Sequence, residues 1–415
     1  MSYGRYEQAN LRRKFEASNR ARPRLCDTRQ RRFSRVTIFL GCGFAAKYRE
    51  GGGNFSVPLQ WMLGLRRLRL DAIWLELLPA TKSPRTDQAN IDNFRRQMRE
   101  HGLVGRYCLL YQKPASEAQD LEAMRCIGMS RRELSERLAG ENTLLNLSYS
   151  LHPPLLLQFE RRIFCDLDPS EIFYWMTTME LGQSQHHEFW TIGLNVNAAD
   201  CQLPSSRQKW RTFFPLADTR LLKRKPRPRV PKFTTVGQWY WSGVVEVNGE
   251  FPDLSKKFAF EPYVDLPKRL PEAGFELAMN INADDPEIER LRNRGWRVVS
   301  PHKVARTPRA YRHYIENALA EFTAIKGVDV RWRTGWLSDR AAAFLATGRP
   351  VITEDTGAAR YLPQESGFHF VRSADEAVAA AKEVLADWPR LSRQARDCAE
   401  EIFDSEKNLR KILGL

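Results

Sequence analysis

The sequence lacks the marks of a membrane-spanning or secreted chain. Its 415 residues contain no uninterrupted apolar run of about 18 residues, the length that a membrane helix requires. The first residues, MSYGRYEQANLRRKF, contain no apolar core of the kind that defines a secretory signal peptide. We therefore expect a protein of the cytoplasm that does not cross a membrane.

Paired cysteine motifs are also missing. The seven cysteines are scattered, and none forms a CxxC pair or lies at zinc-ligand spacing from a histidine. This pattern is typical of reduced thiols in the cytoplasm and argues against both a disulfide framework and a zinc site.

Excess charge is present but is confined to two segments. Residues 1–35 hold eleven basic and three acidic residues, and residues 223–232 (KRKPRPRVPK) hold six basic residues and no acid, whereas the net charge of the whole chain is +15. A nucleic-acid surface would instead spread over a folded face with aromatic residues between the charges. Nucleic acid is therefore not an expected partner, while a weak contact of the basic tail with an anionic membrane stays open.

The order of the predicted elements indicates an α/β protein with two domains. VTIFLGCG and DAIWLEL read as strands on either side of an amphipathic helix, PLQWMLGLRRL, with Pro58 in its first turn. The proline-rich segment 223–232 interrupts the pattern, and strands alternate with helices again beyond it. We predict two facing Rossmann-like domains, divided into a basic tail (1–35), an N-terminal acceptor domain (36–222), a linker (223–232), a C-terminal donor domain (233–395) and a last helix (396–415).

Two small-residue loops in the second domain are candidates for a ligand site. We expect a helix over 311–325, a strand over 328–334, a helix beginning at Ser338 and a strand over 351–355. Thr334–Gly335 and Thr356–Gly357 would then lie at one edge of a parallel sheet, where open α/β sheets bind ligands. The backbone N–H groups at the start of the helix after Ser338 would attract a phosphate. The alternative is that these glycines form ordinary turns.

The segments TGWLSDRAAAFLATGRPVITEDTGAARYLP and YREGGGNFSVPLQWMLGLRRL resemble those of GT-B-fold glycosyltransferases. The likeness is greatest to a bacterial group of sugar transferases with the pattern GW-S-R…YLA-GRPV…DTG. It implies a hexosyltransferase-type enzyme that moves a sugar from a nucleotide diphosphate sugar to an unidentified hydroxyl or amine, and a C-terminal helix that crosses back to the N-terminal domain. It also implies no metal and no cofactor, because GT-B enzymes stabilise the leaving diphosphate with helix dipoles and basic residues.

The resemblance further implies roles for individual residues. Those that would surround the donor phosphates and sugar are Gly51, Gly52, Gly53, Arg333, Thr334, Gly335, Trp336, Ser338, Asp339, Arg340, Glu354, Asp355, Thr356 and Gly357. The nucleobase would lie against Pro301, His302 and Val304. The aromatic run QWYWSG (238–243) is predicted to be sheet core rather than a sugar-binding platform.

The chain departs from the pattern of the bacterial group at the position of a candidate catalytic base. The bacterial group often has a histidine after the three glycines, where this chain has Asn54, and an amide orients a substrate but does not accept its proton. Asp166 and Asp168, at the end of a predicted strand, are the other catalytic candidates. Two alternatives to a transferase stay open: a nucleotide-sugar epimerase on the same fold, or a protein that binds a nucleotide sugar without catalysis.

Overall fold

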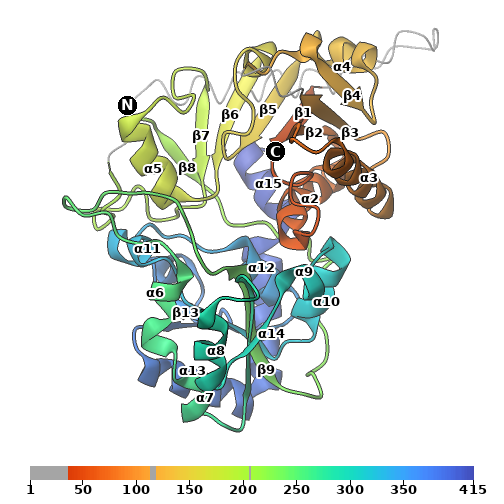
Figure 1. Ribbon diagram of the computed structural model, residues 1–415. Helices are drawn as coiled ribbons and strands as arrows, with labels where there is room; N and C mark the ends of the chain where they lie inside the picture. The colour runs from red at the N-terminus through yellow and green to blue at the C-terminus, as the bar shows by residue number, and fades with distance from the viewer. Residues whose placement is uncertain (1–35, 113–117, 205–206) are drawn as a thin grey trace, which may run out of the picture. The chain divides into compact units, whose positions relative to one another are not determined.

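Two β-sheets organise the computed structural model of this protein (Figure 1). The structure describes residues 36–112, 118–204 and 207–415. Residues 36–415 belong to one compact unit. The basic tail, for which the sequence leaves a membrane contact open, lies outside the described residues.

The first sheet has eight strands in the order β4-β3-β2-β1-β5-β6-β7-β8, and every pair is parallel except β3 with β4. All six residues of its central strand, TIFLGC, are buried, as expected for a parallel strand covered on both faces. The strands are β1 (Thr37–Cys42), β2 (Asp71–Pro79), β3 (Tyr107–Gln112), β4 (Met124–Ile127), β5 (Asn142–Leu147), β6 (Arg161–Asp166), β7 (Glu188–Thr191) and β8 (Trp210–Thr212).

The second sheet has six parallel strands in the order β11-β10-β9-β12-β13-β14. Reversal of the strand order between β9 and β12 is the Rossmann arrangement, which opens a crevice at the carboxyl ends of those two strands. The strands are β9 (Lys232–Gln238), β10 (Gly274–Asn280), β11 (Arg297–Val299), β12 (Ala320–Thr323), β13 (Val351–Glu354) and β14 (Phe368–Val371).

Helices connect the strands of both sheets. Several begin at a serine whose hydroxyl accepts a backbone N–H of the first turn, as at Ser83, Ser130, Ser338 and Ser373. Among the described residues, no helix has the length and apolar character needed to traverse a lipid bilayer. The α-helices are α2 (Gly52–Arg67), α3 (Pro84–Glu100), α4 (Arg131–Leu138), α5 (Pro169–Thr178), α6 (Lys256–Phe260), α7 (Leu266–Arg269), α8 (Pro286–Asn293), α9 (Pro301–Val304), α10 (Pro308–Glu316), α11 (Gly327–Trp332), α12 (Asp339–Ala346), α13 (Ala374–Ala386), α14 (Trp388–Cys398) and α15 (Ser405–Leu413).

Three predicted elements are wrong. The helix expected over 311–325 ends at Glu316, and residues 320–323 form β12, a buried strand between β9 and β13. The strand expected over 328–334 is the short helix α11, which buries Val328 and Trp332 one turn apart. Hydrophobic pattern alone cannot separate such short buried segments. Helix α2 begins at Gly52, so Pro58 lies inside the helix rather than in its first turn.

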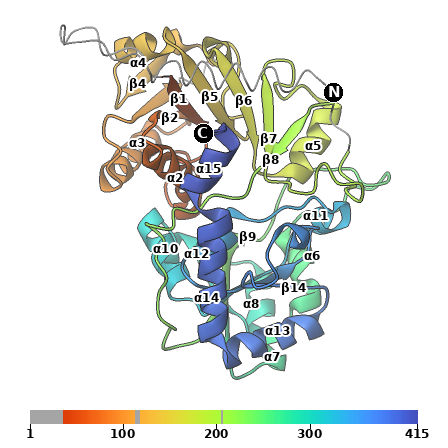
Figure 2. The same ribbon diagram turned by 180° about the vertical axis from the view of Figure 1, so that it is seen from behind.

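The last helix packs against the first domain, as predicted. Helix α14 continues through a π-helical turn (Ala399–Phe403) to α15, and Figure 2 shows this path in blue. A β-carbon added to Gly64 of α2 would lie 2.6 Å from the Leu409 side chain and 2.9 Å from the Ser405 carbonyl of α15. Gly64 therefore allows the two helices to approach closely.

The proline-rich segment carries no helix or strand before Lys232, where β9 begins, as its composition predicts. The buried guanidinium of Arg349 donates hydrogen bonds to the carbonyls of Lys225 (3.1 Å) and Pro226 (2.9 Å). The segment is thus fixed to the second domain, while the predicted domain boundaries stay a prediction.

Candidate functional site

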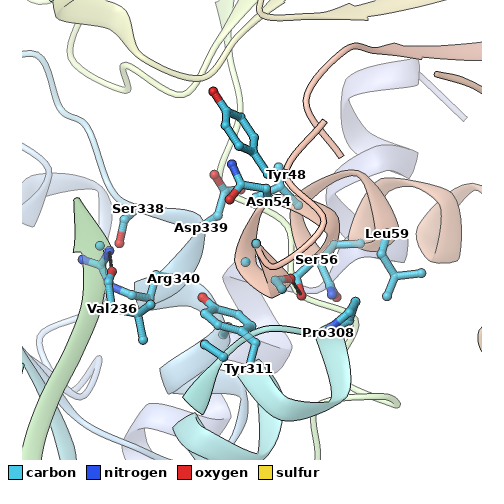
Figure 3. A pocket seen from close by; sticks show the side chains of 18 of the residues that line it. Tyr48, Asn54, Ser56, Leu59, Val236, Pro308, Tyr311, Ser338, Asp339 and Arg340 are labelled. Atoms are coloured by element: carbon cyan, nitrogen blue, oxygen red, sulfur yellow. Dashed lines mark hydrogen bonds between the residues drawn. The ribbon is translucent and has the colours of Figure 1, made fainter. Parts of the chain in front are cut away.

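A cavity of about 540 Å³ lies at the carboxyl ends of strands from both sheets. Its walls come from the loop after β1, the first turns of α2, the end of β9, and helices α9, α10 and α12. Figure 3 shows side chains of α2 (Asn54 and Ser56), α10 (Tyr311) and α12 (Asp339 and Arg340) around this cavity. We refer to it as the cleft.

The structure brings half of the predicted site residues together. Those that line the cleft are Gly51, Gly52, Gly53, Asn54, Pro301, His302, Trp336, Ser338, Asp339 and Arg340. Those that lie outside its lining are Asp166, Asp168, Val304, Arg333, Thr334, Gly335, Glu354, Asp355, Thr356 and Gly357. Most of the predicted residues that line the cleft therefore come from two sequence segments, 51–54 and 336–340.

The glycine-rich loop forms the start of α2. Gly51 is the N-cap residue, and no side chain caps this end of the helix. The Gly52 N–H donates to the Ala305 carbonyl (2.9 Å), whereas the Gly53 and Asn54 N–H groups have no hydrogen-bond partner among residues 36–112, 118–204 and 207–415. Exposed N–H groups at the start of a 16-residue helix favour an anion.

The start of α12 forms the opposite wall. The Ser338 hydroxyl accepts the Ala341 N–H (3.0 Å), which confirms Ser338 as the N-cap residue. Burial raises the pKa of the Asp339 carboxyl to about 6. The Arg340 guanidinium pairs with the buried Glu321 and donates to the Val236 carbonyl (2.8 Å) and the Thr323 hydroxyl (3.1 Å). The hydrogen-bond donors of the Arg340 guanidinium are therefore used by groups of the protein itself.

The two Thr-Gly loops contact one another rather than the cleft. The Gly335 N–H donates to the Thr356 carbonyl (2.8 Å), and the Gly357 N–H donates to Asp355 Oδ1 (2.9 Å). Gly335 has a φ of 75°, and a β-carbon there would lie 2.3 Å from the backbone nitrogen of Asn195. The amides assigned to a phosphate are thus bonded internally. The expected placement is wrong because residues 328–332 form a helix, so that Thr334 does not end a strand.

The remaining candidates outside the cleft also have partners within the chain. Arg333 Nε donates to Asp200 (2.8 Å), and Glu354 accepts the Ile325 N–H (2.8 Å). Val304, at the end of α9, packs against a buried apolar cluster of the second domain. None of these side chains is positioned to meet a ligand in the cleft.

Comparison with solved structures finds the same architecture. A trehalose-6-phosphate protein of E. coli bound with UDP-2-fluoro glucose is 10% identical, with a TM-score of 0.51 over 91% of this chain and 98% of that one. An apo structure of OtsA is 11% identical, with a TM-score of 0.50 over 92% of this chain and 98% of that one. The chain has the GT-B fold. No family model matches the sequence, and no curated protein does.

In this GT-B chain, Asp166 and Asp168 lie beside the cleft without lining it. The Asp166 side chain is fully buried and accepts hydrogen bonds from the Thr191 hydroxyl (2.6 Å) and the Asp168 N–H (2.8 Å). Asp168 Oδ2 lies 2.6 Å from the Lys326 ammonium. Leu167, between them, is the residue that reaches the cleft. The Asp166 carboxyl is thus enclosed by the protein, whereas the Asp168 side chain is paired with Lys326 and is 35% exposed.

Stability should depend on pH through Asp166, because burial raises the pKa of its carboxyl to about 7. The folded state binds this proton more tightly than the unfolded chain, so the resulting stability is complete below about pH 4 and is lost as pH rises through 7. Asp166→Asn keeps an uncharged group and should gain stability relative to the wild type between pH 4 and 8, by about 1 kcal/mol or more. Urea unfolding of both proteins at several pH values measures this difference, and a difference that does not change with pH would contradict the expectation.

Several residues that line the GT-B cleft were not predicted from the sequence. These are Tyr48, Ser56, Gln238, Trp241, Tyr311 and Arg312. Gln238 and Trp241 could have been found from the sequence, because Gln238 ends β9 and Trp241 lies in the loop after it, at the point where the strand order reverses. Only Trp239 of the run 238–243 is sheet core, with no exposed surface, whereas Tyr240 and Trp241 are each 43% exposed.

No metal site is evident in the described part of this GT-B chain. Across residues 36–112, 118–204 and 207–415, no group of three or more His, Cys, Asp or Glu side chains is arranged to hold a metal ion. Asp168 and Glu171 are instead paired with Lys326, and Asp166 accepts hydrogen bonds from a backbone N–H and a hydroxyl.

Proposed function

We propose that this protein transfers a sugar from a nucleotide diphosphate sugar to an acceptor hydroxyl or amine. The observation that carries the proposal is the convergence of two helix starts, those of α2 and α12, on a cleft of about 540 Å³ at the carboxyl ends of both sheets. Helix starts favour anions, and such crevices are the usual ligand sites of doubly wound sheets.

The proposed donor lies with its diphosphate between Gly53–Asn54 and Ser338. The N–H groups of Gly53 and Asn54 and the positive end of the α2 dipole stabilise the diphosphate as it leaves. The nucleobase lies against Pro301 and His302, which line the cleft next to the glycine-rich turn. Asn54 orients the sugar or the acceptor, because a side-chain amide does not act as a base at neutral pH.

The reaction proposed here needs no divalent metal. The work that a metal ion does in other sugar transferases, neutralising the leaving diphosphate, is assigned to helix dipoles and to the cationic side chain of Arg312 in the cleft. Catalysis should therefore persist in EDTA.

Calorimetric titration with UDP, TDP and GDP tests the nucleotide site. The E. coli neighbour, bound with UDP-2-fluoro glucose, makes UDP the first choice. A nucleotide at about a hundred times its dissociation constant should raise the free energy of unfolding by roughly 2.7 kcal/mol. If none of the three nucleotides binds or stabilises the protein, the proposal is wrong.

Product analysis then distinguishes a sugar transferase from an epimerase and from a protein that only binds a nucleotide sugar. A transferase releases nucleotide from the matching nucleotide sugar faster when an acceptor is supplied, with equal rates in EDTA and in added magnesium. An epimerase would convert the nucleotide sugar without an acceptor, and a binding protein would release no nucleotide. Either of the last two results would contradict the proposed transfer.

A further inference from the structure

Trp241 is a large aromatic residue that remains exposed inside the cleft. It belongs to the loop directly after β9, at the reversal of strand order where ligands bind in this kind of sheet. It is 43% exposed, whereas Trp239, two residues earlier, has no exposed surface. Packing in the core thus explains why residue 239 is a tryptophan, but it does not explain the tryptophan at 241.

The Trp241 side chain is nevertheless held firmly. Its indole N–H donates to Glu171 Oε1 (2.8 Å), and the Lys326 ammonium lies 4.9 Å from the ring centroid. Its backbone N–H donates to the Ser255 hydroxyl (2.9 Å). Two contacts orient the ring and a third fixes the backbone, so the ring keeps one orientation without being buried.

The groups that hold the ring are themselves fixed. The Lys326 ammonium lies 2.6 Å from the carboxylates of both Asp168 and Glu171, and the Glu171 side chain is only 2% exposed. Asp168 and Glu171 belong to the segment around the start of α5, whereas Lys326 precedes α11 in the second domain. Trp241 therefore rests on a charged cluster that joins the two domains.

Gly243 shows that the loop is shaped around this contact. A β-carbon added to Gly243 would lie 1.6 Å from Glu171 Oε1 and 2.4 Å from Trp241 Nε1. Any larger residue at 243 would force the carboxylate or the indole to move. The glycine thus leaves the space in which the two groups meet.

One face of the Trp241 ring covers Lys326, which leaves the opposite face for a ligand in the cleft. A pyranose ring presents a flat face of C–H groups, which stacks on the electron-rich face of an indole, and hydroxyls around its edge, which need polar partners. Gln238 lines the same cleft, and its amide oxygen already accepts from Asn280 (2.9 Å), so its NH₂ group is oriented as a donor.

We propose that Trp241 is the stacking platform for a saccharide acceptor, so that the acceptor is a glycan rather than a lipid or an amino-acid side chain. This inference rests on the proposed function and specifies its acceptor. Trp241 is assigned to the acceptor because its ring is bonded to Glu171 of the N-terminal domain, the domain that the sequence assigns to the acceptor.

Saturation-transfer NMR on the full chain tests the platform. The probes are the methyl pyranosides of glucose, galactose, mannose and N-acetylglucosamine, with and without UDP. The wild type should transfer saturation to the C–H face of at least one pyranoside. Trp241→Ala and Trp241→Leu should weaken that binding by about tenfold or more, and Trp241→Phe by less, because it keeps a ring. The affinity for UDP, measured by calorimetry, should stay within about twofold of the wild type in all three variants.

Tyr240→Ala is the matched control. Tyr240 is the neighbouring residue, is also 43% exposed, and bonds to Asp285 (2.9 Å) without lining the cleft. The Tyr240→Ala substitution should leave pyranoside binding unchanged. Thermal unfolding of each variant checks that it is folded, and Trp241→Leu retains apolar bulk in case Trp241→Ala does not fold.

Three results would overturn the platform while leaving the nucleotide site intact. These are pyranoside binding that survives in Trp241→Ala and Trp241→Leu, no saturation transfer to any pyranoside by the wild type, or equal transfer to benzyl alcohol, which has no sugar ring. Failure of the wild type to bind any nucleotide would instead count against the proposed function. The probes without UDP then still decide whether Trp241 binds a sugar.

Discussion

Arg340→Met is expected to lower the free energy of unfolding by about 3–5 kcal/mol. The Arg340 guanidinium is only 14% exposed and pairs with Glu321, whose side chain has no exposed surface. Removing the cation leaves a buried carboxylate without its counter-charge, in the strand that joins β9 to β13. Urea-induced unfolding at pH 7 measures the change.

The double variant Arg340→Met/Glu321→Met is the control for this pair. With both charges replaced by apolar side chains of similar length, most of the lost stability should return, because the cost arises from the unpaired charge and not from the lost volume. A double variant as unstable as Arg340→Met alone would mean that the bonds of Arg340 to Val236 and Thr323 dominate instead.

Gly52→Ala is expected to destabilise the protein by about 3 kcal/mol and to weaken nucleotide binding by at least about tenfold. A β-carbon at this position would lie 2.3 Å from the carbonyl oxygens of both Ala305 and Thr307. These are backbone atoms that cannot rotate away, so the first turn of α2 must shift and lose its hydrogen bond to Ala305. Thermal unfolding and calorimetric titration with UDP measure the two effects.

Gly53→Ala is the matched control for Gly52→Ala. Its β-carbon would lie 3.5 Å from the Tyr311 ring, an ordinary contact, and alanine favours a helix over glycine by about 0.8–1.0 kcal/mol. Gly53→Ala should therefore leave the free energy of unfolding unchanged or raise it slightly. Equal losses of thermal stability in the two variants would show that the Gly52 contact with Ala305 and Thr307 is not what requires glycine.

Several parts of the site could be predicted because their signals are local. Ser338 begins α12 as expected, since a serine before an alanine-rich segment satisfies a backbone N–H of the first turn. The glycine-rich segment 51–53 lines the cleft, although it forms the first turn of α2 rather than a loop before it. The resemblance to GT-B glycosyltransferases also predicted the fold, which this chain shares with structures that are only 10–11% identical to it.

The roles of the small residues could not be predicted in the same way. Gly335 and Gly357 have the positive φ values of 75° and 92° that a phosphate loop would need, yet these serve the packing of two loops against Asn195. Arginine is a common phosphate ligand, which made Arg340 a reasonable candidate. In the structure, however, Arg340 pairs with Glu321, nineteen positions earlier in the chain. In both cases the partner lies far away in the sequence, and residue type does not reveal it.

The sequence by itself determined the two-domain α/β architecture and the start of α12, because hydrophobic runs and N-cap residues act over a few residues. Only the tertiary structure decided which polar groups are free for a ligand and which are used within the chain. A hydrogen bond or an ion pair depends on the distance between atoms. The packing of the two sheets brings Lys326 to Glu171 across 155 positions of sequence, and Glu171 to Trp241 across 70 positions.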